Sequence, residues 1–431
     1  MASDSPSSQD PKSDGSEPER RRTRNVRRKS GLGFAAAVSG LLVILFGSFY
    51  VLVVGIGGRA ESAEYALIID AGSSGSRIHL YQWQHDDDAP ISLIEEIPLG
   101  KECKKTEPGL VDPLVDDDSC RQSSDIGELL EPLINCARSE LDDRVEDPKE
   151  IPLYLMATAG MRLCRSENEP RHDEIMGQVR AHLEGTPFDL RDASTIEAKE
   201  EALYAWVAAN YQNLSLRTKT ENGTIGILEL GGASGQIAFV PLDPKPEDTE
   251  VVHIAGSKYK VYARGYDGVG KTEITKAFKN EKLCFPINYG GWGAGDYGEC
   301  WIKIIEYMRT TNQRAFSQLK EDTPPDHDVK FIAISNYYHT PSLLGQKNAL
   351  DYDKLRSAGS EYCSTKWKKI LEKYSDEPPK FLSGHCLMAA YIPALLTRGF
   401  RVKDDGRVML RLDRRDAEVD WTLGALILLL H

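Results

Sequence analysis

The sequence has 431 residues, of which 41% are hydrophobic and 28% charged, so it can bury a sizeable core and is neither low-complexity nor collagen-like. This length favours two coupled lobes. The net charge is −13, and because nucleic acids bind basic surfaces, no nucleic-acid partner is expected.

The N-terminal segment predicts where the protein is located. Residues 1–30 are polar and end in a cluster of basic residues, which predicts a disordered basic cytosolic tail. Residues 31–58 carry no charge and are rich in Leu, Val, Phe and Ile. Since these 28 residues would exceed the bilayer core as a helix, we predict a transmembrane anchor with the remaining chain across the membrane. Small residues from Gly58 to Ala63 leave a cleaved signal peptide as the alternative.

The cysteines agree with a lumenal or extracellular location. Eight occur after the apolar segment, without a CxxC pair, and this favours disulfides over a zinc site. We expect the pairs Cys284 with Cys300 and Cys363 with Cys386, because each closes a short loop within one lobe. Sequence alone leaves other pairings of eight cysteines open.

Two glycosylation sequons also agree with this location. Asn213 and Asn222 each begin an Asn-X-Ser/Thr sequence in a polar stretch that is predicted as a surface loop. Because such sequences are common by chance, they are supporting evidence only.

The first segment with chemical information follows the predicted anchor. An apolar run, Ala66 to Ile69, leads into Asp-Ala-Gly-Ser-Ser-Gly-Ser-Arg, and an alternating run, Ile78 to Trp83, follows. This pattern predicts a strand, a tight turn and a returning strand. Backbone N–H groups in such a turn can surround an anion, and Asp70 at its entrance can hold a cation beside it. An ordinary hairpin with a glycine-rich turn is the alternative.

Two further segments come next along the chain. Residues 153–162 predict a strand that ends in another turn of small residues, and residues 196–211 predict a helix rich in Ala, Glu and Leu. Glu197 and Glu201 share one face of this helix, with Glu200 alongside. Exposed carboxylates on helices are usually only solvated, so this pattern alone does not establish a catalytic base.

The pattern of acid, turn and strand then recurs 159 residues after its first occurrence. An apolar run, Ile225 to Leu228, precedes Glu-Leu-Gly-Gly-Ala-Ser-Gly-Gln, and Glu229 takes the place of Asp70. Two such turns facing each other across a cleft would offer N–H donors to a phosphate and two carboxylates to a metal ion. The repeat therefore predicts two related lobes with a phosphoryl-transfer site between them.

Two later segments leave alternatives open. Gly265 to Thr272 satisfies the phosphate-binding pattern GxxxxGK[ST]. No convincing strand with a partner aspartate follows it, so a loop near the nucleotide is preferred to a true P-loop. In residues 331–340, Tyr337 and Tyr338 could stack on a base, and packing in the core is an equal alternative.

Four segments in this order are similar to the conserved regions of the ectonucleoside triphosphate diphosphohydrolase (apyrase) family. They are DAGSSGSR, ATAGMR, KEEALYAW and LELGGASGQ, and the resemblance runs from about Tyr65 to a closing segment at Val419. It implies an α/β, actin-like (ribonuclease H-like) fold of two duplicated lobes with a cleft between them. It also implies that water attacks the terminal phosphate of nucleoside di- or triphosphates directly, with Ca²⁺ or Mg²⁺ as cofactor.

The resemblance implies roles for individual residues. Glu201 would be the general base, and Ser234 with Gln236 would orient the attacking water. Asp70 and Glu229 would hold the metal ion through its water shell. Backbone and hydroxyl groups would surround the phosphates at Ser73, Ser74, Gly75, Ser76, Arg77, Thr158, Ala159, Gly231, Gly232, Ala233 and Gly235.

The sequence departs from the family pattern at three positions. Glu229 stands where Asp is usual, Gly235 where Thr is usual, and Ala202 where Gly usually follows the base. These departures leave a catalytically weakened nucleotide-binding ectodomain as one alternative. A P-loop or actin-like kinase is another.

The resemblance also predicts lobe boundaries and a location. The first lobe is expected to comprise residues 64–192 plus 408–431, and the second residues 193–407. A single N-terminal anchor resembles the endomembrane members of the family, which favours a lumenal domain in the Golgi or other endomembranes over the plasma membrane. The expected partners are a nucleoside di- or triphosphate and, through the anchor, the membrane.

Overall fold

The structure, a computed structural model, describes most of the chain after the predicted anchor. Residues 1–30 and 31–58 and the sequon residue Asn222 lie outside the described residues. No helix in the described part is long and apolar enough to span a bilayer. The described residues are 63–85, 91–100, 103, 105–111, 120–213, 215–216, 223–311, 314–322, 329–412 and 419–430.

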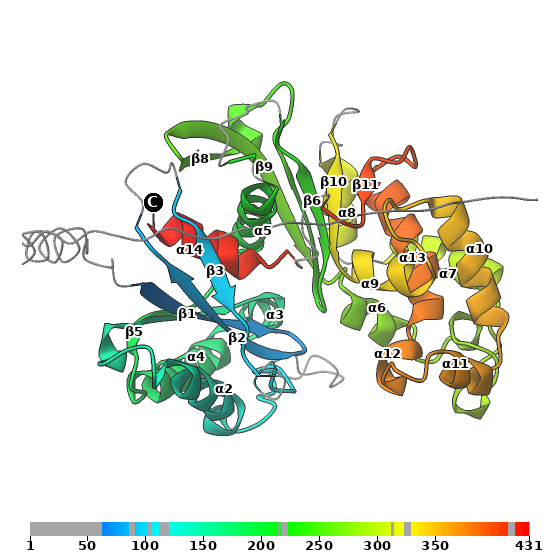
Figure 1. The fold of residues 1–431 in the computed structure, drawn as a ribbon. Helices are drawn as coiled ribbons and strands as arrows, with labels where there is room; N and C mark the ends of the chain where they lie inside the picture. Colours follow the sequence, from blue (N-terminus) through cyan, green and yellow to red (C-terminus); the bar gives the residue numbers. More distant parts are fainter. Residues whose placement is uncertain are drawn as a thin grey trace, which may run out of the picture. The chain divides into compact units, whose positions relative to one another are not determined.

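The first sheet has the strand order β3-β2-β1-β4-β5 (Figure 1). β1 and β2 pair antiparallel around the turn that follows Asp70, which confirms the predicted hairpin. β4 pairs parallel with β1, and β5 pairs parallel with β4. The strands are β1 (Glu64–Gly72), β2 (Gly75–Trp83), β3 (Ile94–Ile97), β4 (Pro152–Ala157) and β5 (Asp189–Thr195).

The second sheet has the strand order β11-β10-β6-β7-β9-β8. β6 and β7 form the second predicted hairpin, β10 pairs parallel with β6, and β9 pairs antiparallel with β7. The strands are β6 (Gly226–Leu230), β7 (Ser234–Phe239), β8 (Glu250–Ile254), β9 (Ser257–Asp267), β10 (Phe331–Ser335) and β11 (Val408–Met409).

The two sheets repeat one arrangement around their acidic residues. In each sheet, the strand that carries the acid lies between its hairpin partner and a parallel strand. Asp70 pairs with Met156 on β4, and Glu229 pairs with Ile334 on β10. Both parallel strands end one residue further on. The internal repeat seen in the sequence therefore extends to the strand order and its register.

The apolar run of β1 is buried on both sides. Leu67 and Ile69 belong to a core shared with α2 (Ile126–Leu141) and α4 (Glu169–Glu184). Ala66 and Ile68 belong to a second core, which includes residues of α5 (Ala198–Gln212), α14 (Trp421–Leu430) and the second sheet. Alternate residues of a strand point to opposite faces, so a strand covered on both faces needs a continuous apolar run.

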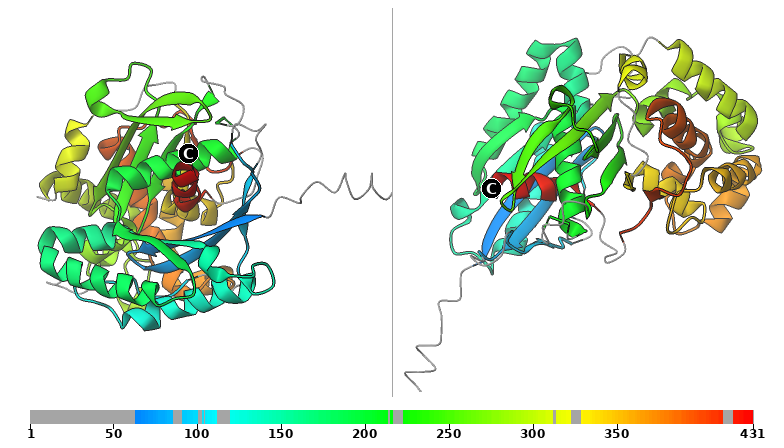
Figure 2. Two further views of the ribbon diagram at one scale, coloured as in Figure 1. Left: turned by 90° about the vertical axis from the view of Figure 1, so that its left-hand side faces the viewer. Right: turned by 90° about the horizontal axis from the view of Figure 1, so that it is seen from above.

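Helices α5 and α14 pack closely against each other between the two sheets (Figure 2). A Cβ atom added at Gly424 of α14 would collide with the carbonyl oxygen of Tyr204 in α5. Glycine at this position therefore permits the close approach of the two helix backbones.

We expect Gly424→Ala to lower the free energy of unfolding by about 1–3 kcal/mol, because the added methyl group would push α14 away from α5. Chemical denaturation monitored by circular dichroism measures this change. Gly177→Ala in α4 is the matched control, since no atom lies within 4 Å of a Cβ added there. That variant should be neutral or up to about 1 kcal/mol more stable, and equal stability of both variants would contradict the packing argument.

The remaining helices accompany the two sheets. α3 follows β4, and α6 to α13 share a large core with the second sheet, on the right-hand side of Figure 1. They are α3 (Ala159–Glu167), α6 (Lys271–Ala277), α7 (Tyr297–Thr310), α8 (Arg314–Glu321), α9 (Asn336–Leu343), α10 (Tyr352–Ser364), α11 (Trp367–Lys373), α12 (Pro379–Leu382) and α13 (His385–Ala394).

Both predicted disulfides, Cys284–Cys300 and Cys363–Cys386, are confirmed. Two further bonds, Cys103–Cys136 and Cys120–Cys164, link loops to the helices around the first sheet. All eight cysteines are therefore paired, as an oxidising compartment would allow.

The end of the second lobe differs from the expectation in one detail. Residues 408–431 are expected in the first lobe, and within this range β11 pairs with β10 of the second sheet. α14 packs mainly against α5 and also contacts β1. The expected lobe boundaries remain a prediction, and the pairing of β11 favours a boundary after Met409.

Candidate active site

The small-residue turns of the two hairpins touch each other. A Cβ atom added at Gly232, in the second turn, would collide with Oγ of Ser73 in the first turn. A Cβ atom added at Gly160, at the start of α3, would lie 3.2 Å from Cα of Ser73. The three predicted phosphate-binding segments, around Ser73, Thr158 and Gly232, therefore converge.

Three buried carboxylates accompany these turns. Asp70, Glu201 and Glu229 are each no more than 7% exposed. Burial is the main cause that raises the pKa of each of the three carboxyl groups above its ordinary value. Their mutual repulsion adds to this increase, since Asp70 raises the pKa of Glu201 and both raise the pKa of Glu229. Such an excess of buried negative charge is suited to a cation.

Asp70 at the end of β1 forms an ion pair with the residue opposite it on β2. Nη1 of Arg77 lies 3.2 Å from Oδ2 of Asp70. Burial raises the pKa of Asp70, and the guanidinium of Arg77 partly opposes this effect. Arg77, predicted to contact phosphate, is thus held beside the first acidic residue.

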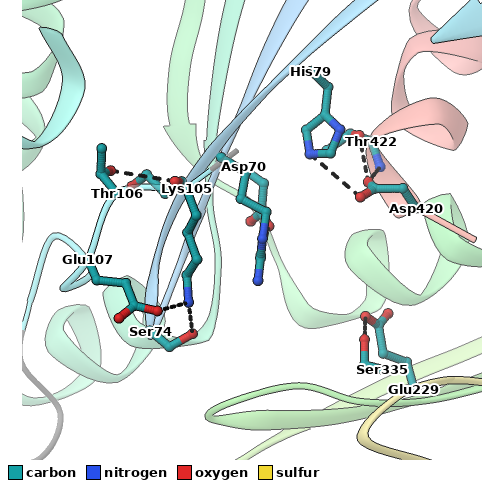
Figure 3. A network of polar contacts seen from close by, with 12 residues as sticks. Asp70, Ser74, His79, Lys105, Thr106, Glu107, Glu229, Ser335, Asp420 and Thr422 are labelled. Atoms are coloured by element: carbon teal, nitrogen blue, oxygen red, sulfur yellow. Dashed lines mark hydrogen bonds and ion pairs between the residues drawn. The ribbon is translucent and has the colours of Figure 1, made fainter. Parts of the chain in front are cut away.

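Glu229 is held by a serine that the sequence analysis did not identify. Ser335 Oγ donates a hydrogen bond of 3.1 Å to Glu229 Oε1, as Figure 3 shows, while the buried Oε2 has no hydrogen-bond partner among the described residues. Ser335 ends β10 and has a φ of 56°, which is unusual for a residue other than glycine. Only the strand pairing locates it, because Ser335 on β10 lies next to Leu230 as Ala157 on β4 lies next to Ala71.

The residues present fit a divalent cation that takes only part of its ligands from the protein. Within the described ranges, no three His, Cys, Asp or Glu side chains are placed to hold a metal ion together. Carboxylate oxygens such as the unpaired Glu229 Oε2 are ligands that Ca²⁺ and Mg²⁺ prefer, and both ions commonly retain water. Water and phosphate oxygens would complete the shell of such an ion.

Glu201 lies in the first turn of α5 and forms an ion pair with Arg162 of α3. Oε2 of Glu201 is 2.9 Å from Nη2 of Arg162. The neighbouring Glu200 has a different role, because its side chain accepts a hydrogen bond from the backbone N–H of Glu197 and caps the helix. Arg162 ends the segment ATAGMR, but nothing in the sequence pattern indicated its partner.

Ser234 and Gln236, the predicted water-orienting pair, are in direct contact. Gln236 Nε2 donates to Ser234 Oγ at 2.7 Å, and both side chains are buried. A Cβ atom at Gly235, one of the three departures noted in the sequence, would lie 3.0 Å from Val269 Cγ2. Val269 therefore occupies part of the space that a larger residue would need. Ala202, the third departure, is buried in the core shared by α5 and both sheets.

A second polar network, centred on the buried His79, lies beside Asp70 and involves the start of α14. His79 on β2 contacts Glu96 at 2.9 Å. It also lies 3.5 Å from Asp420, and Thr422 Oγ1 donates a hydrogen bond of 2.6 Å to Asp420 (Figure 3). Burial alone would lower the pKa of His79, but Asp420 and Glu96 outweigh it and raise the pKa to about 9. His79 is therefore a buried cation at neutral pH, and it fixes the start of α14 against the first sheet.

The P-loop alternative is wrong. Gly265 to Asp267 belong to β9, and the backbone N–H groups of Lys271 and Thr272 donate to the carbonyl oxygens of Gly231 and Gly232. These N–H groups are therefore not free to bind phosphate. The segment instead stabilises the second turn through these two backbone hydrogen bonds.

Two other predicted residues are placed as follows. Tyr337 is fully buried, so the core-packing alternative holds for this residue and it does not stack on a base. Asn213, the described sequon residue, lies partly exposed at the end of α5, and its Nδ2 donates to Ser215 Oγ at 3.0 Å.

Comparison with known proteins agrees with this arrangement. Residues 58–288 and 287–431 match the GDA1/CD39 (nucleoside phosphatase) family. The chain belongs to this family. It is 26% identical to ectonucleoside triphosphate diphosphohydrolase 1 of Mus musculus, over 85% of this chain and 81% of that protein. It is 27% identical to probable apyrase 6 of Arabidopsis thaliana, over 91% of this chain and 76% of that protein.

Solved structures show that the α/β fold with two sheets is shared more widely. A nucleoside triphosphate hydrolase from Neospora caninum has a TM-score of 0.51 at 15% identity, covering 91% of this chain and 89% of that one. A Ppx/GppA protein of Aquifex aeolicus also has a TM-score of 0.51 at 15% identity, covering 85% and 97%. The family resemblance seen in the sequence is thus confirmed, and nucleoside phosphatases of this family generally use divalent cations.

Proposed function

We propose that this GDA1/CD39 family member removes the terminal phosphate from nucleoside di- and/or triphosphates by direct attack of water. The observation that carries the proposal is the convergence of two small-residue turns with the buried carboxylates Asp70, Glu201 and Glu229. Phosphoryl transfer depends on positioning and charge neutralisation, and this site offers both.

Each group then has a defined task. Glu201 accepts a proton from the attacking water, while Ser234 and Gln236 hold the water in line with the phosphorus atom. A bond forms from the water oxygen to phosphorus, and the bond from phosphorus to the bridging oxygen breaks. Asp70 and Glu229 would hold a Ca²⁺ or Mg²⁺ ion, which when bound would neutralise charge on the phosphates.

The fold and location complete the proposal. The equivalent arrangement of the two sheets supports an actin-like fold of two duplicated lobes, with residues 64–192 as most of the first and residues 193–407 as the second. The uncharged segment 31–58 supports a single N-terminal anchor, and the four disulfides support a lumenal or extracellular domain, with the Golgi or other endomembranes favoured.

Phosphate release by the purified full chain tests this function. Nucleoside di- and triphosphates of each base are supplied with Ca²⁺ or Mg²⁺, without any phosphate acceptor other than water. We expect release of inorganic phosphate from at least one of them. Binding of a nucleotide without release would indicate a weakened binding protein, and transfer only to an added acceptor would indicate a kinase.

A further inference from the structure

Arg162 connects the residues proposed to activate water with the second sheet. Its guanidinium contacts Glu201 of α5, Ser234 of β7 and Asp267 of β9. We propose that Arg162 is a positioning residue, which holds Glu201 and Ser234 in the orientation needed for attack and is itself held in place by Asp267. This inference rests on the proposed role of Glu201 as the base.

The guanidinium of Arg162 is fixed by Asp267 and by the backbone of Ile196. Arg162 Nε donates to both carboxylate oxygens of Asp267 at 3.0 Å, and Nη2 donates to Asp267 Oδ1 at 2.8 Å. Nη1 donates to the carbonyl oxygen of Ile196 at 3.1 Å. A planar guanidinium bound at two edges has little freedom to rotate, so its remaining contacts have a fixed direction.

A single nitrogen atom of Arg162, Nη2, contacts both Glu201 and Ser234. Nη2 lies 2.9 Å from Glu201 Oε2 and 3.5 Å from Ser234 Oγ. Asp267 on β9 lies opposite Ser234 on β7 in the sheet. The residue that holds Arg162 therefore has a fixed position relative to Ser234. A displacement of Arg162 would therefore move Glu201 relative to Ser234.

The charge of Arg162 also matters for Glu201. Burial is the main cause that raises the pKa of Glu201, and carboxylates that face it from three strands, namely Asp70 on β1, Glu229 on β6 and Asp267 on β9, add to this effect. Arg162 lowers the pKa of Glu201 against these effects. Loss of the cation would therefore keep Glu201 protonated to a higher pH.

A matched control is available on the same helix. Arg165 of α3 forms an ion pair of 2.6 Å with Glu197, but both side chains are substantially exposed. Exposed pairs contribute little, so Arg165→Met should keep turnover and the pH profile of the wild type.

The test measures kcat, KM and the pH dependence of kcat for full-length variants with the preferred nucleotide, beside circular dichroism. We expect Arg162→Met to lose roughly 10²-fold in kcat with KM within about threefold, because misplaced groups react slowly. In Arg162→Met, the acidic limb of the plot of kcat against pH should move to higher pH by roughly one pH unit or more. Arg162→Lys should keep the limb near that of the wild type, since it retains the charge, but leave kcat low because it lacks the planar fork.

Several results would overturn the inference. A folded Arg162→Met variant with normal kcat, or with reduced kcat and an unmoved acidic limb, contradicts it, as does an equal loss in Arg165→Met. If Arg162→Met does not fold, Arg162→Lys and Asp267→Asn decide, and normal kcat in both would refute it. Should Glu201→Gln be inactive while the Arg162 variants are normal, only this inference fails. Should Glu201→Gln be active, the base assignment itself fails.

Discussion

Glu201→Gln is expected to lower kcat by roughly 10²–10⁴-fold while nucleotide affinity changes little. The amide keeps the size of the side chain but cannot accept a proton from water. Glu201 is suited to this task because it is buried beside the converging turns and held by Arg162 at 2.9 Å. Phosphate release under saturating nucleotide gives kcat, and equilibrium binding of the nucleotide gives the affinity.

Glu200→Gln is the control for this prediction. Glu200 is adjacent in sequence but caps α5 through a hydrogen bond from the Glu197 N–H at 2.8 Å. Glutamine can accept the same hydrogen bond, so helix and activity should both be preserved. Equal losses in the two variants would show that Glu201 has no special role.

Removal of divalent cations is expected to abolish activity while the fold persists. Burial raises the pKa of Asp70 and of Glu229, so ionised carboxylates here are unfavourable without a cation, and the phosphates of a nucleotide would add further negative charge. The four disulfides hold the chain together independently of metal. Phosphate release and circular dichroism after EDTA treatment, and again after return of Ca²⁺ or Mg²⁺, measure both effects. Full activity in metal-free protein would contradict this prediction.

Glu229 should also influence which ion works best. Its longer side chain receives the hydrogen bond from Ser335 at 3.1 Å, and Asp at this position would withdraw the carboxylate. Mg²⁺ requires near-octahedral geometry at about 2.0–2.1 Å, whereas Ca²⁺ accepts looser shells at about 2.3–2.6 Å. We therefore expect the ratio of Ca²⁺ to Mg²⁺ activity to fall roughly threefold or more in Glu229→Asp, since the shorter residue would suit Mg²⁺ better.

Ser335→Ala is the comparison for this change. It removes the hydrogen bond to Glu229 but keeps the length of the acidic side chain. If the ratio of Ca²⁺ to Mg²⁺ activity falls only in Glu229→Asp, the effect comes from the length of the acidic side chain. If the ratio falls equally in Glu229→Asp and Ser335→Ala, the effect comes from loss of the hydrogen bond. An unchanged ratio in Glu229→Asp would show that this carboxylate does not tune the ion.

The sequence located the hairpins because they are local. A buried strand, a turn of small residues and a returning strand depend on neighbouring residues, and the same is true of the α5 segment. The repeat of Asp70 at Glu229 predicted that two turns should face each other, and the contact of Ser73 with Gly232 agrees with that prediction. The pairs Cys284–Cys300 and Cys363–Cys386 were also accessible, because their loops are short.

The GxxxxGK[ST] segment shows where a local pattern is insufficient. Its residues match a phosphate-binding loop, but the backbone N–H groups of Lys271 and Thr272 already donate to the second turn. Gly265 is glycine because a Cβ atom there would lie 2.6 Å from Cβ of Ala198 in α5. The motif thus arises from close packing, which a sequence pattern cannot distinguish from ligand binding.

The sequence by itself determined the family, the two hairpins and the acidic residues that enter their turns, because strand periodicity and turn composition are properties of contiguous residues. Only the tertiary structure decided how these residues are held. Arg162 meets Asp267 across 105 positions of the chain, and Ser335 meets Glu229 across 106. Such partners are selected by the pairing of distant strands and by the need to satisfy buried charge, and neither leaves a periodic signal in the sequence.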